Sequence, residues 1–204
     1  GCLDRDSGFW NIRVHGVIYE PAAWNRRKRI LVQLLRRAMG ASDLDLDSDI
    51  FRERISGFLV NHERGRRIVI QVGEKTYRLR RKSKRSGEFG GTLRLSTEDV
   101  HRLEEDGHIL DGWLHFRVVT RGGDAPLIIG RCQLIGPSGI SVISDIDDTV
   151  KHSEVWRRRE MLVNTFLHQF DVVPGMSALY SQWAQDGAAF HYVSSSPWQL
   201  FRPL

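Results

Sequence analysis

The sequence lacks any apolar run long enough to cross a bilayer, so it predicts no membrane-spanning helix. It has only two cysteines, Cys2 and Cys132, and their separation argues against a disulfide scaffold and for a reducing compartment. No signal peptide is present, so we expect a cytoplasmic protein. An initiator methionine is also missing, and the chain stops at residues 202–204 just after a new element begins. We therefore interpret the sequence as a fragment open at both ends.

Acidic residues are outnumbered, 25 against 30 lysines and arginines, which gives a net charge of +5 and favours an anionic partner. Nucleic acid, a phosphorylated substrate and an acidic membrane surface would all fit. The densest basic run, Arg78–Arg85, contains no aromatic residue that could stack on bases. This run is more typical of a solvated edge strand and loop, so we expect no nucleic-acid partner.

A basic amphipathic helix is predicted from Asn25 to Met39, with Gly40 as its C-terminal stop. The apolar face is expected to hold Ile30, Leu31, Leu34, Leu35, Ala38 and Met39. The other face carries Arg26, Arg27, Lys28, Arg29, Arg36 and Arg37. This helix either packs its apolar stripe on the domain as an ordinary surface helix, or makes peripheral contact with an anionic membrane through Arg26–Arg37.

Short strands separated by turns dominate the rest of the first two thirds of the chain. Alternating or β-branched segments occur at residues 10–19, 68–72, 77–80, 92–95, 112–119 and 126–135, the last two around a turn at 121–124. Between them, residues 43–47 read as an acidic connector, Ser48 as the cap of a second helix to about Leu59, and Ser96 as the cap of one short helical turn. This pattern predicts a β-rich, antiparallel sandwich-like domain with a helical insertion. Because Gly136–Gly139 is the best linker, we place one domain at 1–137 and a second at 138–204.

The second domain opens with a strand that ends on carboxylates. Residues 140–144 are β-branched and apolar enough for an inner strand, and Asp145, Asp147 and Asp148 follow at once. In extended chain Asp145 and Asp147 point the same way, and two such acids repel each other unless a cation or proton lies between them. This stretch is therefore predicted to be a site.

The remaining residues predict a βαβ unit. Residues 152–170 read as a helix, and Pro174 opens another that ends at Gly187 and buries Met176, Leu179, Tyr180 and Trp183. The strand 188–193 then leads directly into Ser194-Ser195-Ser196-Pro197. Because the ends of parallel strands open on one edge, the aspartate and serine clusters should be neighbours.

These groups suit phosphoryl transfer assisted by Mg²⁺ held by Asp145 and Asp147. Asp145 fits the nucleophile that forms an aspartyl-phosphate, and Asp147 fits the general acid and base. Ser194 can hold phosphoryl oxygens, and Thr149 can hydrogen-bond to orient Asp147. Asp148 should face away, as a capping or surface residue.

The acidic cluster has other possible interpretations. An EF-hand loop from Asp145 would need glycine at its sixth and glutamate at its twelfth position, where Val150 and Trp156 stand. A sugar-transferase Asp-x-Asp site leaves the serines unexplained, and a purely structural turn is the simplest alternative. Among nearby polar residues, His152 and His191 receive no role, and Ser195 and Ser196 are interpreted as turn residues.

Three stretches carry a resemblance to a known family. Ser144–Val155, the Val173–Trp183 region and Tyr192–Trp198 resemble the catalytic domain of the actin-patch type of phosphatidate phosphatase, within the haloacid dehalogenase superfamily. Val14–Pro21 fits the preceding β-rich domain of that family more loosely. The resemblance implies that 138–204 is the first part of a three-layer, Rossmann-like α/β domain. It also implies Mg²⁺-dependent hydrolysis of phosphatidate, an anionic phospholipid, to diacylglycerol.

The resemblance further implies a lysine and acidic metal ligands in later motifs, which would lie beyond Leu204, so this fragment alone is expected to be incomplete. A phosphatase of another phosphomonoester or of a phosphoprotein is the alternative within enzymes. A non-catalytic binding module with a vestigial site is the alternative outside them. The sequence identifies no protein partner.

Overall fold

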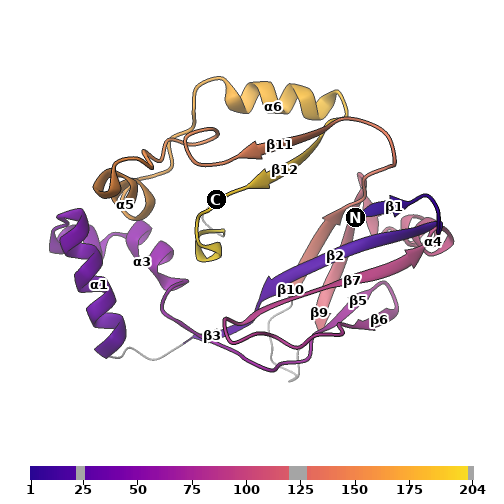
Figure 1. Cartoon of the computed structure of the whole chain (residues 1–204), viewed down its shortest axis with the longest axis horizontal. Coiled ribbons are helices and arrows are strands. Elements are labelled where there is room, and N and C mark those ends of the chain that lie inside the picture. Colours follow the sequence, from indigo (N-terminus) through magenta and orange to yellow (C-terminus); the bar gives the residue numbers. More distant parts are fainter. Residues whose placement is uncertain (22–25, 120–127, 202–204) are drawn as a thin grey trace. The chain divides into compact units, whose positions relative to one another are not determined.

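The computed structural model describes residues 1–21, 26–119 and 128–201, except the side chains of Pro21 and Arg27, and it is mixed α/β with antiparallel sheets (Figure 1). The chain forms two compact units. The first contains residues 1–20 and 61–138, and the second contains 21–60 and 139–204. The helical segment, predicted as an insertion in the first domain, thus clusters with the residues that carry the candidate site. Strands β3 (Tyr19–Pro21) and β4 (Val60–His62) pair where the chain passes between the units.

The first unit contains two antiparallel sheets, as the alternating segments predicted. One has the order β1-β2-β7, with β1 at Cys2–Asp4, β2 at Phe9–Val17 and β7 at Glu88–Ser96. The other has the order β10-β9-β5-β6, and β8 pairs with β9. Its strands are β5 (Val69–Val72), β6 (Lys75–Arg78), β8 (Ile109–Leu110), β9 (Trp113–Val119) and β10 (Ile128–Gln133). The predicted turn at 121–124 lies outside the described residues.

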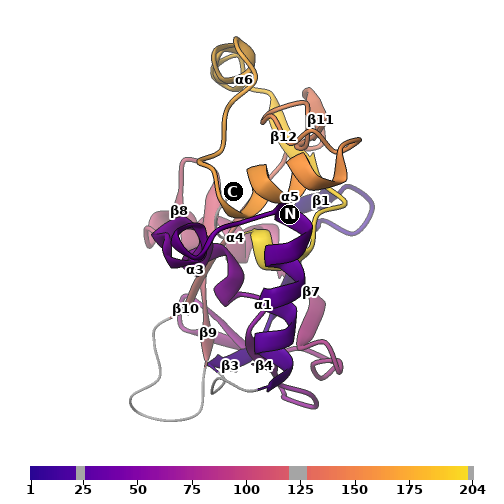
Figure 2. The same ribbon diagram turned by 90° about the vertical axis from the view of Figure 1, so that its left-hand side faces the viewer.

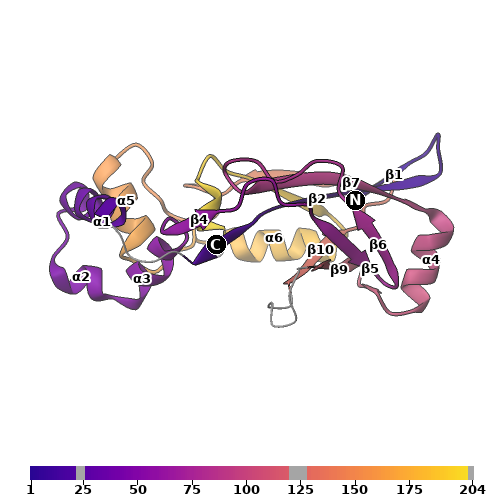
Figure 3. The same cartoon turned by 90° about the horizontal axis from the view of Figure 1, so that it is seen from below.

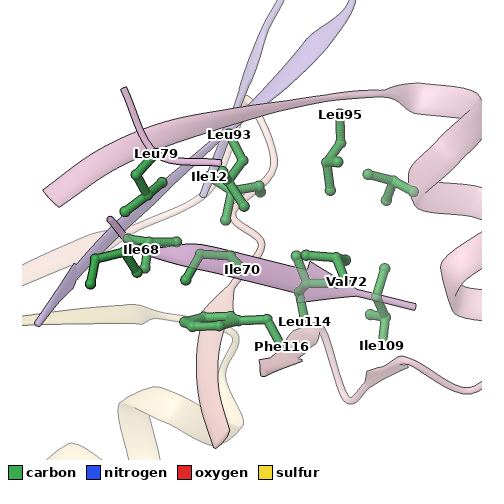
Figure 4. Close-up of a cluster of buried hydrophobic side chains, with 12 residues drawn as sticks. Ile12, Ile68, Ile70, Val72, Leu79, Leu93, Leu95, Ile109, Leu114 and Phe116 are labelled. Carbon is green, nitrogen blue, oxygen red and sulfur yellow. The ribbon is translucent and has the colours of Figure 1, made fainter. Parts of the chain in front are cut away.

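The core of the first unit lies between these sheets (Figure 4). Ile12 and Leu95 from one sheet and Ile70 and Leu114 from the other are each 0% exposed, because alternate residues of a strand point to the same face. Helix α4 (Thr97–Glu105) adds Val100 to this core. Its Ser96 cap was predicted, but the helix is longer than the single turn expected.

The second unit is built on a small helical core (Figures 2 and 3). Buried residues of α1 (Arg26–Met39), α3 (Asp49–Ser56), α5 (Arg158–Phe166) and the 3₁₀ turn η1 (Trp198–Leu200) meet there. Ser48 caps α3 as predicted, accepting a hydrogen bond from the backbone N–H of Phe51 at 3.2 Å. The acidic stretch predicted as a connector is helix α2 (Asp43–Asp47), because Ser42 and Asp45 form a capping box.

The amphipathic helix is present, and its buried face matches the predicted one only in part. Met39 is buried and Leu35 packs against the core, as predicted. Val32 is also buried, and Lys28 is only 8% exposed. Ile30 and Leu34, which were expected to point inward, are 51% and 58% exposed. The sequence contains apolar residues on more than one side of this helix, and packing against α3 and α5 selects the face with Val32 and Met39.

The predicted βαβ unit is also present. Strands β11 (Ser141–Asp145) and β12 (Ala189–Val193) pair in parallel, and α5 and α6 (Met176–Gln185) lie between them in sequence. Helix α6 covers one face of the pair (Figure 1), where the Tyr180 ring lies 4.9 Å from that of Phe190. None of the residues of α6 is fully buried, although four were expected to be. The predicted helix 152–170 is shorter at both ends, because residues 152–157 form a loop and α5 ends at Phe166.

Candidate active site

The site begins at the carboxyl ends of two adjacent parallel strands. The register pairs Ser141 with Ala189 and runs to Asp145 opposite Val193, so both strands end at one edge. Ser194 follows β12 directly, and its hydroxyl donates to Asp147 Oδ2 at 3.0 Å. The structure therefore brings the aspartate and serine clusters together as the βαβ pattern predicted.

Asp147 is the most heavily engaged residue of this edge. Its Oδ1 accepts a hydrogen bond from the Ser153 hydroxyl at 2.7 Å and lies 3.1 Å from Lys151 Nζ. Its Oδ2 accepts hydrogen bonds from Ser194 at 3.0 Å and Ser196 at 2.8 Å. Burial by itself raises the pKa of Asp147, but the bonds from Ser153, Ser196 and Lys151 and the charge of Lys151 outweigh it and lower the pKa to about 2. Asp147 is therefore a carboxylate at neutral pH.

Lys151 is a buried partner of this carboxylate. Its side chain is 8% exposed, and its ammonium lies 4.2 Å from the centre of the Phe170 ring. The guanidinium of Arg54, from α3, also lies over that ring, at 3.8 Å. Arg54 Nη1 donates to the backbone carbonyls of Asn164, Thr165 and His168, at 3.1, 2.7 and 2.6 Å. Helix α3 thus supports the site through Phe170 and Lys151.

Asp148 organises the loop that follows. Its φ is 58°, a left-handed conformation that aspartate tolerates better than most residues. Its carboxylate accepts hydrogen bonds from three backbone N–H groups, those of Ser153, Glu154 and Val155, at 2.7–2.9 Å. Burial raises the pKa of Asp148, but these three bonds prevail and lower it. Asp148 was expected to be a capping residue, and here it caps a loop instead of a helix.

Asp145 differs from the neighbouring aspartates because its side chain is exposed and its carboxylate accepts no described hydrogen bond. In the described ranges, no group donates to its carboxylate, although its backbone carbonyl accepts the Ser144 hydroxyl at 2.7 Å. That hydroxyl also lies 2.8 Å from the phenol oxygen of Tyr180. The strand end is therefore anchored to α6 while the Asp145 side chain stays accessible.

Three of the four donors to Asp147 were not predicted from the sequence. Ser196 was interpreted as a turn residue, and Lys151 and Ser153 were given no role. Thr149 was expected to orient Asp147, but no hydrogen bond joins the two within the part of the chain that the structure describes. Spacing gave no signal, because residues 147–151 form a loop and a step of four residues shares a face only in a helix.

Carboxylates here are too few to form a protein-only metal cage. In the described residues, no group of three or more histidine, cysteine, aspartate or glutamate side chains could hold a metal ion. Mg²⁺ is commonly bound by one or two carboxylates completed by water and substrate phosphate. The free carboxylate of Asp145 fits that mode. Asp147 fits it only by exchanging a donor, because both of its oxygens are engaged.

Comparison with known proteins adds family relationships. Residues 140–204 match the family model described as phosphatidate phosphatase APP1, catalytic domain. The phosphatidate phosphatase APP1 of Saccharomyces cerevisiae is 31% identical over 165 residues, which cover 78% of this chain and 27% of that protein. An uncharacterized protein of Schizosaccharomyces pombe is 40% identical over 79 residues, which cover 37% of this chain and 13% of its own length. The chain thus spans about a quarter or less of these curated relatives.

Proposed function

We propose that this chain is part of an enzyme that hydrolyses phosphatidate to diacylglycerol and phosphate. The reason is that residues 140–204 belong to the family of the APP1 phosphatidate phosphatase catalytic domain. The observation that carries the proposal is the meeting of Asp147 with the Ser194 and Ser196 hydroxyls beside the exposed Asp145. Ligands of open α/β sheets bind at such strand ends. The parallel β11–β12 pair with α6 is consistent with the first part of a haloacid dehalogenase-like, three-layer domain.

In the proposed reaction, Asp145 attacks the phosphorus atom of phosphatidate. A bond forms between its carboxylate oxygen and phosphorus, and the bond from phosphorus to the diacylglycerol oxygen breaks. Asp147 protonates that departing oxygen. It then takes a proton from the water that cleaves the aspartyl-phosphate, which releases phosphate and restores Asp145. The Ser194 hydroxyl holds the phosphoryl oxygens.

The contacts of Asp147 define what its acid role requires. With a pKa of about 2 it is ionised and ready to accept a proton, as the second step needs. To donate one first, it must lose part of the stabilisation that Lys151 and the serines provide. A phosphate dianion attracts the same ammonium and hydroxyl donors. Substrate binding therefore favours transfer of Lys151 and Ser194 from Asp147 to phosphate.

Mg²⁺ belongs to the proposal as the cofactor, with Asp145 and Asp147 as its protein ligands in this chain. When bound, it would offset the repulsion between the carboxylates and the phosphate. The exposed Asp145 can bind a cation without breaking any described contact. Asp147 would first have to release a donor, which is the same change that its acid role requires.

The test compares Asp145→Asn with Asp147→Asn in the full-length protein. The first substitution removes the nucleophilic charge, so we expect no turnover and no phosphoenzyme. The second leaves the nucleophile but removes the proton donor, so activity on lipid should fall by about 10²–10⁴-fold. The loss should be smaller for aryl phosphates, whose leaving groups need little protonation. Mg²⁺-dependent phosphate release and intact-protein mass after acid quenching measure both effects.

Asp171→Asn is the matched control, because Asp171 is an exposed carboxylate of the same unit whose side chain has no described hydrogen bond. It should retain full activity. Full activity in Asp145→Asn, or a covalent phosphate on any other residue, would show that the assignment is wrong. Since Asp147→Asn also slows water attack, trapped phosphoenzyme should accumulate in that variant alone.

Peripheral membrane contact through α1 is part of the same proposal, for a protein that works in the cytoplasm at a membrane surface. The outward face of this helix carries exposed Arg26, Arg29 and Arg37 around Ile30 and Leu34. That combination suits an anionic bilayer. Charge reversal at Arg26 and Arg29 should weaken binding to anionic vesicles, and rising salt should do the same. Binding insensitive to both would leave α1 an ordinary surface helix.

None of the helices in the described residues is long and apolar enough to span a membrane.

A further inference from the structure

The loop between β11 and α5 exposes two neighbouring apolar residues, Val155 and Trp156, which we call the Val155–Trp156 tip. Trp156 is 73% exposed and Val155 is 51% exposed. Single exposed apolar residues are common on protein surfaces and need no explanation. A nearly bare tryptophan beside a second apolar side chain is less common, because tryptophan has much apolar area to lose from water.

The tip is held in place. Asp148 binds the backbone N–H groups of Ser153, Glu154 and Val155, which fixes the chain up to the tip itself. Ser153 is 2% exposed, and its hydroxyl donates to Asp147. The tip is therefore presented by a rigid loop, and that loop is hydrogen-bonded directly to the candidate catalytic carboxylate.

Positive charge follows the tip immediately. Arg157 and Arg158 are exposed, and the nearest carboxylate oxygen to Arg157 is that of Glu154, at 3.8 Å. In the described residues, Arg158 forms no ion pair. Arg157 also occupies the N-cap position of α5 without a side-chain capping bond. Glu160 in the first turn of α5 already complements the helix dipole. An anionic surface would therefore add partners for the Arg157 and Arg158 side chains.

We propose that the Val155–Trp156 tip inserts into the headgroup region of an anionic lipid bilayer, with Arg157 and Arg158 contacting lipid phosphates. Tryptophan favours this region because its ring is largely apolar while its N–H can still reach polar groups. Basic residues add attraction to anionic headgroups. The purpose of this contact rests on the proposed function, because it places the loop of Asp147 at the surface where a phosphatidate headgroup lies.

The test measures partition of the 204-residue chain onto phosphatidylcholine vesicles containing phosphatidylserine. Trp156→Ser should lower the partition coefficient on the order of tenfold, because a large apolar side chain no longer leaves water. Trp156→Phe should keep most of the binding. It should also remove one component of the quenching of tryptophan fluorescence by brominated lipid. Because the chain has 6 tryptophans, the contribution of Trp156 is measured as the difference in quenching between wild type and Trp156→Phe.

Trp183→Ser is the matched control, because Trp183 is a half-exposed tryptophan of the same unit, stacked on Tyr180 in α6. It should bind like wild type, and the urea midpoints of all variants should show that they are folded. Binding should also fall as salt rises from about 0.1 M to about 0.5 M.

Four results would overturn the inference. They are unchanged binding in Trp156→Ser, an equal loss in Trp183→Ser, equal binding to neutral vesicles, and unchanged lipid quenching in Trp156→Phe. A dimer that forms in solution and disappears in Trp156→Ser, without vesicle binding, would instead make the tip an interface between copies. Because the vesicles contain no phosphatidate, the outcome does not depend on catalysis. A failed phosphatase assay and a failed membrane assay can therefore be told apart.

Discussion

Arg54 offers the sharpest prediction about stability, because one buried guanidinium connects α3 to the end of α5. Arg54 is 4% exposed, and its Nη1 reaches three backbone carbonyls at 2.6–3.1 Å. Burial lowers the pKa of Arg54, but an arginine in a protein stays protonated, so these are charge-assisted bonds. The acceptors lie at the carboxyl end of α5, where a cation also complements the helix dipole.

Replacing Arg54 by alanine leaves these carbonyls without their partner and removes the contact with Phe170. Each bond to a charged group is worth roughly 1.5–3 kcal/mol, but such values are not additive. A buried acceptor left without its partner costs about 1–3 kcal/mol. Because three carbonyls are affected and such costs are not fully additive, we expect Arg54→Ala to lower the free energy of unfolding by about 3–5 kcal/mol. Arg54→Lys should recover only a small part, because an ammonium lacks the planar fork of the guanidinium.

Urea denaturation measures this loss, and Arg52→Ala controls for it. Arg52 lies on the same helix but pairs with Asp47 in solvent, with side chains 62% and 72% exposed. Arg52→Ala should lower the free energy of unfolding by less than about 1 kcal/mol. Both substitutions replace arginine by alanine in α3, so the change in helix propensity is the same. Equal losses in Arg54→Ala and Arg52→Ala would refute the reasoning, because the buried bonds would then contribute nothing beyond an exposed pair.

Three further expectations concern pH, capping and packing. Since the pKa of Asp147 falls from 3.8 to about 2, this carboxylate stabilises the fold fully above about pH 4. The free energy of unfolding from urea titrations should drop by about 2 kcal/mol as pH falls from about 4 toward 2, and less in Asp147→Asn. Ser48→Ala should cost about 1 kcal/mol in the same assay, through the lost α3 cap. Gly130→Ala should cost about 1–3 kcal/mol, because its new Cβ would overlap the Phe116 ring. Gly90→Ala should be milder, since its Cβ would lie 3.6 Å from the nearest atom.

The strands could be predicted from the sequence because burial on a sheet leaves a period of two. Ile12 and Val14 in β2, and Ile70 and Val72 in β5, are buried at alternate positions as expected. The meeting of Asp147 with Ser194 also followed from a rule, because parallel strands joined by helices end at one edge. These features depend on local pattern and on topology, both of which a sequence carries.

The buried face of α1 could not be predicted in the same way. A helix that has leucine, isoleucine and valine on several sides offers more than one apolar stripe. Which stripe becomes buried depends on the shape of α3 and α5, and here the choice leaves Ile30 and Leu34 outside. Periodicity therefore predicted the helix but not its orientation.

Lys151, Ser153 and Ser196 could not be predicted as partners of Asp147 because they meet it through loop conformation. The chain turns back after Asp148 adopts a positive φ, and the carboxylate of Asp148 then holds the returning backbone N–H groups. That turn brings the Ser153 hydroxyl to Asp147 Oδ1. No periodic pattern records such a loop, because two of its residues, Asp148 and Glu154, adopt an uncommon positive φ.

The same turn gives the three aspartates of the acidic cluster different surroundings. Asp145 stays free because it ends the strand, whereas Asp147 is surrounded by donors because the loop folds back over it. Asp148 stabilises the loop, because its carboxylate accepts three backbone N–H groups. Three acids within four residues therefore repel one another little, since Lys151 neutralises one and backbone N–H groups solvate another. This arrangement leaves Asp145 as the uncompensated carboxylate of the cluster, which is what the proposed attack on phosphorus requires.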